Sequence, residues 1–203
     1  MKIICIGRNY VTHAKELNNP IPEKPVFFMK PETALLIKNR PFFHPEFSKD
    51  IHYEVELVFR INKVGKYIQE KFAHSYYDKV GIGIDLTARD IQSQCKAKGL
   101  PWEVAKAFDS SAPLSHFIPL DEFDSVRNIN FSLNKNGQQV QKGNSGDMLF
   151  DIDHIIAYVS QFVTLKIGDL IYTGTPAGVG KMVVGDEFEA FIEGKSMLKM
   201  QVK

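Results

Sequence analysis

The sequence predicts a β-rich protein of the α+β class, organised as a single domain over residues 1–203. Segments with apolar residues at alternate positions, typical of strands, outnumber segments with helical spacing, and the two kinds do not alternate regularly. A doubly wound α/β fold would need that regular alternation. Of the 203 residues, 44% are hydrophobic, which is enough to fill one hydrophobic core.

Residues 1–45 combine a strand, a short helix and an extended connection. The strand is predicted at residues 2–6 and the helix at residues 11–17. Six prolines between residues 20 and 45 predict an extended stretch, with short strands around residues 26–29 and 34–37. We expect this part to cover or connect the rest of the domain and not to fold alone.

The main strands are predicted in the second part, residues 46–203. Residues 51–62 form one long alternating pattern and residues 80–86 an apolar run. Asn136-Gly137 predicts a tight hairpin between the next two strands. Those strands, and two later ones, are expected at residues 128–134, 138–141, 169–172 and 188–192.

Two helices are predicted in this second part. Thr87 and Asp90 have the spacing of a capping box for a helix over residues 88–98, which should end at Gly99. Asp151 is expected to cap the other helix. The apolar face of that second helix would carry Ile152, Ile155, Ile156, Val159 and Phe162.

Charge and cysteine content exclude several classes of protein. The formal net charge is +1 and no basic run is present, which argues against nucleic acid or an anionic membrane as a partner. The apolar stretch at residues 3–6 is far too short for a signal peptide or a membrane span. Cys5 and Cys95 form neither a disulfide framework nor a zinc motif. We therefore expect a cytoplasmic protein.

Three acidic residues are the candidate metal ligands. Glu54 and Glu56 alternate with apolar residues, so a strand would point both carboxylates the same way. Two adjacent carboxylates repel each other unless a cation lies between them, and Asp85, at the end of the apolar run, can supply a third oxygen. An all-oxygen set favours Mg²⁺ or Mn²⁺. The ordinary alternative is a solvated acidic strand face.

Other candidate residues carry a weaker signal taken one at a time. His13 and Glu16 are neighbours on a helix, where the carboxylate could orient the imidazole, although exposed pairs of this kind are common. Lys106 lies among small and apolar residues and could hold a substrate oxygen, or simply extend to solvent. Arg89 and Gln92 share a helical face that suits a substrate carboxylate, or merely a polar surface.

A glycine-rich loop at residues 173–180 follows a predicted strand. Its backbone amides and the Thr175 hydroxyl could hold an anion, and a tight structural turn is the alternative. It is not a phosphate-binding P-loop, because Met182 follows Gly180-Lys181 where that motif has Ser or Thr.

Taken in order, these segments resemble the fumarylacetoacetate hydrolase family, most closely its short acylpyruvase and oxaloacetate decarboxylase-like branch. The resemblance runs nearly end to end, and its specificity lies in the ordered set and not in any one motif. The matching segments are Gly7-Arg8-Asn9-Tyr10 with His13 and Glu16, Phe28-Met29-Lys30-Pro31, His52-Tyr53-Glu54-Val55-Glu56-Leu57, residues 83–90, residues 98–102 with Lys106, Gly168-Asp169, and residues 173–180.

The resemblance implies a fold of rolled, packed mixed sheets with few helices, usually a homodimer. It implies that residues 46–203 form the metal-binding core, and that Glu54, Glu56 and Asp85 hold Mg²⁺ or Mn²⁺. His13 and Glu16 would form a catalytic dyad on a lid-like segment, with Lys106 as a third catalytic residue. The residues implied to bind a small α-keto acid substrate are Arg8, Lys30, Arg89, Gln92 and Thr175.

The hypothesis for function is a metal-dependent hydrolase that cleaves the C–C bond of small 2,4-diketo acids, the acylpyruvates, to pyruvate and a carboxylic acid. His13 and Glu16 would activate the water, and Lys106 would help to stabilise charge on the departing pyruvate fragment. Oxaloacetate decarboxylation or tautomerisation, and isomerisation of a 2-hydroxymuconate-type diacid, are alternatives at the same site. A catalytically silent carboxylate-binding protein is the alternative from another class.

Overall fold

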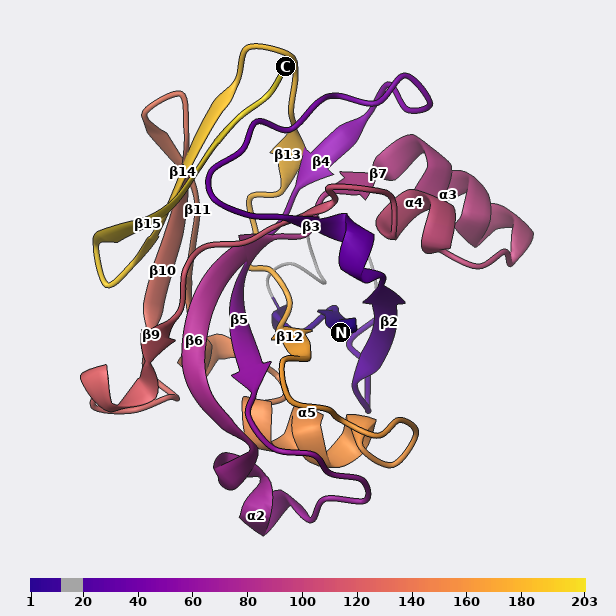
Figure 1. Cartoon of the computed structure of the whole chain (residues 1–203). Coiled ribbons are helices and arrows are strands. Elements are labelled where there is room, and N and C mark those ends of the chain that lie inside the picture. Colours follow the sequence, from indigo (N-terminus) through magenta and orange to yellow (C-terminus); the bar gives the residue numbers. More distant parts are fainter. Residues whose placement is uncertain (12–19) are drawn as a thin grey trace.

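The central element of the fold is a six-stranded sheet (Figure 1). The computed structural model describes residues 1–11 and 20–203 of the chain. Strand β1 pairs in parallel with β12, and the other neighbours in the sheet are antiparallel. The N-terminal strand is thus an interior strand of the sheet. The strands, in spatial order, are β2 (Val26–Lys30), β1 (Ile3–Gly7), β12 (Leu170–Tyr172), β5 (Val55–Ile61), β6 (Tyr77–Ile84) and β9 (Ile118–Pro119).

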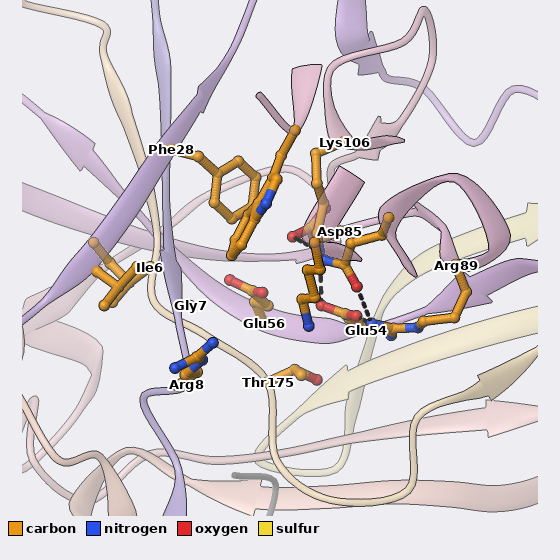
Figure 2. Close-up of a pocket in the computed structure, with 14 residues that line it drawn as sticks. Ile6, Gly7, Arg8, Phe28, Glu54, Glu56, Asp85, Arg89, Lys106 and Thr175 are labelled. Atoms are coloured by element: carbon orange, nitrogen blue, oxygen red, sulfur yellow. Dashed lines mark hydrogen bonds and ion pairs between the residues drawn. The ribbon is translucent and has the colours of Figure 1, made fainter. Parts of the chain in front are cut away.

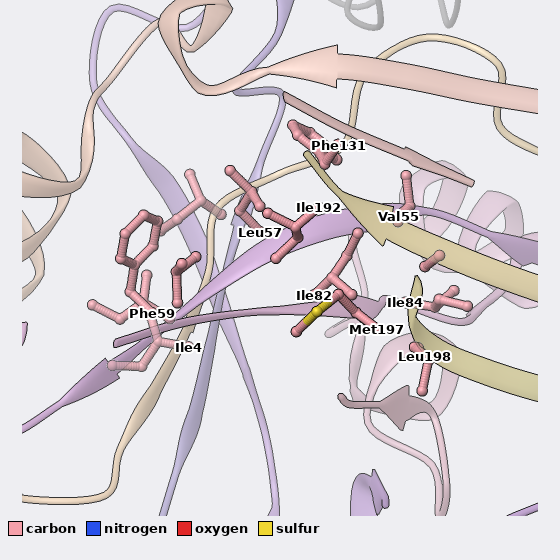
Figure 3. Packing of buried hydrophobic residues seen from close by; sticks show 14 of the residues in the cluster. Ile4, Val55, Leu57, Phe59, Ile82, Ile84, Phe131, Ile192, Met197 and Leu198 are labelled. Atoms are coloured by element: carbon pink, nitrogen blue, oxygen red, sulfur yellow. The ribbon is translucent and has the colours of Figure 1, made fainter. Parts of the chain in front are cut away.

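A four-stranded antiparallel sheet packs against β5 and β6 and closes the main core (Figure 3). Val55, Leu57 and Phe59 point from β5 into this core, whereas Val58 packs on the opposite face of the strand. Since side chains alternate along a strand, Glu56 shares the face of Val58 and points away from the main core. The strands of the second sheet, in spatial order, are β11 (Gln138–Asn144), β10 (Asn130–Lys135), β14 (Glu187–Ile192) and β15 (Lys195–Gln201).

Short strands and helices surround the two sheets. Helices α3 and α4 lie together at one end of the six-stranded sheet, and α2 and α5 lie together at the other (Figure 1). The helices are α2 (Glu70–Ala73), α3 (Arg89–Lys98), α4 (Glu103–Lys106) and α5 (Ile152–Val159). The short strands are β13 (Gly180–Lys181), β4 (Ile51–Tyr53) and β7 (Thr87–Ala88) in one sheet, and β3 (Leu35–Leu36) with β8 (Ala112–Pro113) in another. Within residues 1–11 and 20–203, no helix has the length and apolar character that crossing a bilayer requires.

The predicted long strand over residues 51–62 is wrong in one respect, because it is interrupted at Glu54. The piece before the break, β4, pairs with β7 and β13, whereas β5 pairs with β6 and β12. The two pieces belong to different sheets, and the change of partners leaves Glu54 at the junction. The alternating sequence pattern continues through the junction and therefore does not reveal it.

The predicted capping box at the start of α3 is also wrong. The residue at the N-cap is Ala88, which makes no side-chain cap, and Thr87 lies in β7 with its hydroxyl used inside the protein. The Asp90 carboxylate accepts a hydrogen bond from Ser48 Oγ at 2.7 Å and not from the cap. The end of α3 is as predicted, with Gly99 in the left-handed conformation at φ 63°.

Two other local predictions are confirmed. Asn136 and Gly137 have φ values of 51° and 78° and join β10 to β11 in a tight hairpin. Asp151 caps α5 by accepting a hydrogen bond from His154 N at 2.9 Å. Phe162 lies beyond the end of α5 and is exposed, so it is not part of the buried apolar face. The helix predicted at residues 11–17 lies outside the described residues except for Val11.

Candidate active site

The three predicted metal ligands meet at one place, although Asp85 is distant in sequence from the other two (Figure 2). Antiparallel pairing of β5 with β6 brings Asp85, just after β6, opposite Glu54, just before β5, and Asp85 N donates to Glu54 O at 2.8 Å. One carboxylate oxygen each from Glu54, Glu56 and Asp85 lies within 4.8 Å of the others, and all three side chains are buried. The alternative of a solvated acidic face is thereby excluded.

Lys106 supplies the cation at the centre of the site. Its Nζ donates to Glu54 Oε2 at 3.0 Å, to Asp85 Oδ2 at 2.8 Å and to Thr87 Oγ1 at 2.6 Å. Burial lowers the pKa of Lys106, but Asp85 and Glu54 raise it by more, to about 12. The side chain therefore does not extend to solvent, and it remains a charged ammonium at neutral pH.

Lys30 is a second buried lysine, on the far side of Asp85. Its Nζ lies 2.8 Å from Asp85 Oδ1 and donates to the backbone oxygen and the hydroxyl of Ser111, at 2.9 Å each. A longer bond of 3.3 Å reaches Leu86 O. Lys30 does not line the cavity in front of the carboxylates. Its assignment to substrate binding remains a prediction, and its observed contacts are those of a counter-ion for Asp85.

Glu56 is held by the glycine-rich loop. Gly174 N donates to Glu56 Oε2 at 2.7 Å. Gly174 has φ 93°, and a Cβ at this position would lie 2.8 Å from the Cβ of Asn9, so the close approach requires glycine. Burial and the nearby carboxylates of Asp85 and Glu54 raise the pKa of Glu56 well above its usual range. Within residues 1–11 and 20–203, Glu56 forms no ion pair, so no basic side chain neutralises this carboxylate directly.

Arg89 and Gln92 extend the site along the first turn of α3. One Arg89 terminal nitrogen pairs with Glu54 Oε1, and the other donates to Gln92 Oε1 at 2.7 Å. The third nitrogen, Nε, is buried and has no hydrogen-bond partner among the described residues. The predicted shared face of Arg89 and Gln92 is thus part of the cavity wall, with a donor left for a ligand.

The cavity in front of the carboxylates has a volume of about 40 Å³. Its wall carries four cations, Arg8, Arg89, Lys96 and Lys106. Ile6, Val26, Phe28 and Trp102 make the apolar part of the wall, and Gln92 and Thr175 add polar groups. A cavity with this lining suits a small polyanion.

Sequence reasoning missed three residues of the site. Helical periodicity could have predicted that Lys96 lines the cavity, because it follows Gln92 by four residues and Arg89 by seven and so shares their face of α3. Trp102, which lines the cavity, lies in the segment 98–102 that carries the family resemblance, but it was assigned no role. No local sequence signal marks the buried Gln141 of β11. Gln141 Nε2 donates to Thr175 Oγ1 at 2.9 Å, and Gln141 Oε1 accepts from Val55 N at 2.9 Å. His13 and Glu16, the predicted dyad, lie outside the described residues.

Gln141→Leu is expected to lower the free energy of unfolding by about 3 kcal/mol, since a buried group that loses its hydrogen bond costs about 1–3 kcal/mol. The change removes the partners of Val55 N and of Pro176 O, which now accepts from Gln141 Nε2 at 3.0 Å. Urea unfolding measures the effect. Gln139→Leu, at an exposed position of the same strand, is the control. Equal losses in the two variants would contradict the structural role of Gln141.

Comparison with known proteins extends over nearly the whole chain. The family model described as fumarylacetoacetate (FAA) hydrolase C-terminal matches residues 2–203. The mitochondrial oxaloacetate tautomerase FAHD1 of Mus musculus is 42% identical over 201 residues, 99% of this chain and 91% of that protein. The mitochondrial oxaloacetate decarboxylase of Dictyostelium discoideum is 45% identical over 194 residues, 95% of this chain and 89% of that protein.

A solved structure gives the same picture for the fold. The crystal structure of fumarylpyruvate hydrolase from Pseudomonas aeruginosa, in complex with Mn²⁺ and pyruvate, has a TM-score of 0.94 and 34% identity to this chain. The similarity covers 100% of this chain and 89% of that one. The predicted fold of rolled, mixed sheets with few helices is confirmed.

Proposed function

This chain belongs to the fumarylacetoacetate hydrolase family, and on that premise we propose that it is a divalent-metal-dependent enzyme that interconverts the keto and enol forms of oxaloacetate. The observation that carries the proposal is the buried trio Glu54, Glu56 and Asp85 facing a small, cation-lined cavity. Such a site suits a small 2-keto acid with more than one negative charge. Relatives named for tautomerisation and decarboxylation of oxaloacetate, at 42% and 45% identity, support this substrate.

The three carboxylates fit a divalent ion. Their donor atoms are all oxygens within 4.8 Å of one another, which is the chemistry that Mg²⁺ and Mn²⁺ prefer. Glu56 pairs with no basic side chain among the described residues, and burial, Asp85 and Glu54 raise its pKa, so a cation bound beside it would be favourable. A bound ion would supply a Lewis acid that polarises the 2-keto group and stabilises negative charge developing on its oxygen.

The residues of the chain would position the 2-keto acid end of the substrate. The unpaired Nε of Arg89 offers a buried donor to the substrate carboxylate, beside Gln92 and the Thr175 hydroxyl. Lys106, with a pKa of about 12, keeps its proton at neutral pH. Its three N–H groups already donate to Glu54, Asp85 and Thr87, so it would act as a fixed positive charge near the oxygen that gains negative charge, and it is unsuited to act as a general base.

The proton at carbon 3 would be moved by His13 or Glu16. In the described part of the chain, the titratable groups on the cavity wall are cations or the carboxylates assigned to the ion. His13 and Glu16 follow Arg8, itself a wall residue, by five and eight residues. One of them would take the proton from carbon 3 of the keto form and return it there from the enol.

Hydrolysis of acylpyruvates is the second candidate function. The similarity to the fumarylpyruvate hydrolase of Pseudomonas aeruginosa, at TM-score 0.94, favours it. The same His13 and Glu16 would then activate a water molecule in place of moving the carbon-bound proton. The two candidates share the ion and the 2-keto acid contacts, so they differ only in the substrate's distal half and in the role of that pair.

A substrate panel tests the proposed function. The wild-type protein with Mg²⁺ or Mn²⁺ is expected to speed the loss of the ultraviolet absorbance of enol-oxaloacetate, and EDTA should abolish that rate. Pyruvate release from oxaloacetate and hydrolysis of acetylpyruvate and fumarylpyruvate are measured in parallel. Metal-dependent hydrolysis without any effect on the enol would replace the proposal by the second candidate. A tautomerisation rate that persists unchanged in EDTA would contradict the assigned role of the ion.

A further inference from the structure

Two basic side chains on the cavity wall form no ion pair with Glu54, Glu56 or Asp85 among the described residues. Lys30, Arg89 and Lys106 pair with Glu54 and Asp85. No ion pair in residues 1–11 and 20–203 joins the other two wall cations, Arg8 and Lys96, to an acidic side chain. These two cations are therefore available to a ligand.

Arg8 and Lys96 come from different elements and reach the same cavity. Arg8 directly follows β1 with φ 62°, a left-handed conformation that is uncommon for a side-chain-bearing residue and turns the chain out of the strand. Lys96 lies on the last turns of α3, on the face of Arg89 and Gln92. In Figure 2, Arg8 and Arg89 flank the three carboxylates from different sides.

The Trp102 ring lies beside Lys96 in the cavity wall. Lys96 Nζ lies 5.7 Å from the centroid of the Trp102 ring, within the range of a cation–π contact. The Trp102 ring in turn meets Phe28 edge to face, with ring centroids 6.1 Å apart. The ammonium is thus placed over an apolar wall that would face the carbon skeleton of a ligand.

The local charge favours an anion beside Arg8 and Lys96. Three basic side chains, Lys30, Arg89 and Lys106, pair with Glu54 and Asp85 and equal the three carboxylates in number, so a bound divalent ion leaves the site positive. Burial, then Arg89, Arg8 and Lys106, lower the pKa of Lys96, which shows that its ammonium faces several like charges. One carboxylate of a 2-keto acid would leave Arg8 and Lys96 without a counter-charge, whereas a second carboxylate would supply it.

We propose that Arg8 and Lys96, with Trp102 as the apolar wall, form a subsite for the second carboxylate of a dicarboxylate ligand. This inference rests on the proposed function, because it places the first carboxylate at Arg89 and Gln92. It assigns the preference for dicarboxylates over monocarboxylic 2-keto acids to Lys96, a residue on a helix outside the metal trio.

Malate and lactate test the subsite, because both are 2-hydroxy acids, neither can tautomerise, and of the two only malate carries a second carboxylate. Binding of each to the Mn²⁺-loaded protein is measured by calorimetry in wild type, Lys96→Met and Lys96→Arg. Lys98→Met is the matched control, since Lys98 is exposed on the same helix and does not line the cavity. All four proteins should fold, because both positions are exposed.

Lys96→Met is expected to weaken malate binding about 5- to 10-fold, as for a partly exposed charge pair, and to leave lactate binding unchanged. Lys96→Arg should keep most of the malate affinity, and Lys98→Met should match wild type. Equal weakening of both ligands would mean that Lys96 acts only through the general field of the site and would overturn the proposal. A wild-type protein that binds malate no more tightly than lactate would overturn it as well.

The outcome is separable from that of the proposed function. If enol-oxaloacetate is not turned over but malate selectivity depends on Lys96, the subsite is correct and the assigned reaction is wrong. If turnover is metal-dependent and malate selectivity is the same in Lys96→Met and wild type, the reaction stands and the subsite fails.

Discussion

Glu56→Gln is expected to abolish the stabilisation of the protein by Mn²⁺ while making the metal-free protein more stable than wild type. Glutamine removes one of the three proposed carboxylate ligands, yet its amide oxygen can still accept the hydrogen bond that Gly174 N now donates at 2.7 Å. Wild type should gain about 2.7 kcal/mol at an ion concentration 100 times the dissociation constant. The variant should gain almost no stability from Mn²⁺, because it has lost one carboxylate that would bind the ion. Its metal-free form should be more stable than wild type, because the repulsion of Glu56 by Glu54 and Asp85 is gone.

The stability of the metal-free protein is also expected to depend on pH through Glu56. Burial, Asp85 and Glu54 raise the pKa of Glu56 in the folded protein, so the folded state binds a proton that the unfolded state has lost. The stability of metal-free wild type should therefore fall as pH rises from the ordinary glutamate pKa through the raised one. Glu56→Gln should lack this part of the fall.

Urea unfolding in EDTA at about pH 5 and about pH 8, repeated with Mn²⁺ at the higher pH, measures both effects. Glu46→Gln, at an exposed position, is the control and should behave as wild type in every condition. A Glu56→Gln protein that is less stable than wild type without metal would contradict the repulsion argument. An unchanged Mn²⁺ effect would remove Glu56 from the ligand set.

Lys30→Met is expected to lower the stability of the metal-free protein by about 3–5 kcal/mol, the usual cost of leaving one partner of a buried pair without its counter-charge. Methionine fills similar space but supplies no donor to Asp85, to the oxygens of Ser111 or to Leu86 O. A bound ion adds positive charge beside Asp85, so the deficit should be smaller in Mn²⁺ than in EDTA.

Comparing Lys30→Met in Mn²⁺ and in EDTA shows whether Lys30 acts as a counter-ion for Asp85 or only fills space. Lys24→Met, at an exposed position before β2, controls for loss of a surface charge and should change stability by less than about 0.5 kcal/mol. A Lys30→Met deficit of the same size with and without Mn²⁺ would indicate lost packing and not lost charge. A deficit no larger than that of Lys24→Met would show that Asp85 does not depend on Lys30.

Local patterns predicted much of the fold and the centre of the site. Alternation placed Glu54 and Glu56 together, and the hairpin at Asn136-Gly137 and the cap at Asp151 were found because their geometry depends only on adjacent residues. The same kind of reasoning failed at Thr87. Its spacing to Asp90 fits a capping box, but its hydroxyl is taken by Lys106, a contact that no local pattern contains.

By itself, the sequence identified Glu54, Glu56 and Asp85 as candidate ligands, because residue type and strand periodicity are properties of short segments. Only the tertiary structure decided which basic side chains pair with these carboxylates. Lys30, from the six-stranded sheet, pairs with Asp85, and Lys106, from α4, pairs with both Asp85 and Glu54. Arg8 and Lys96 line the cavity without such a pair among the described residues. The physical reason is that the partner of a buried charge is fixed by how distant segments pack, and packing leaves no period in the sequence.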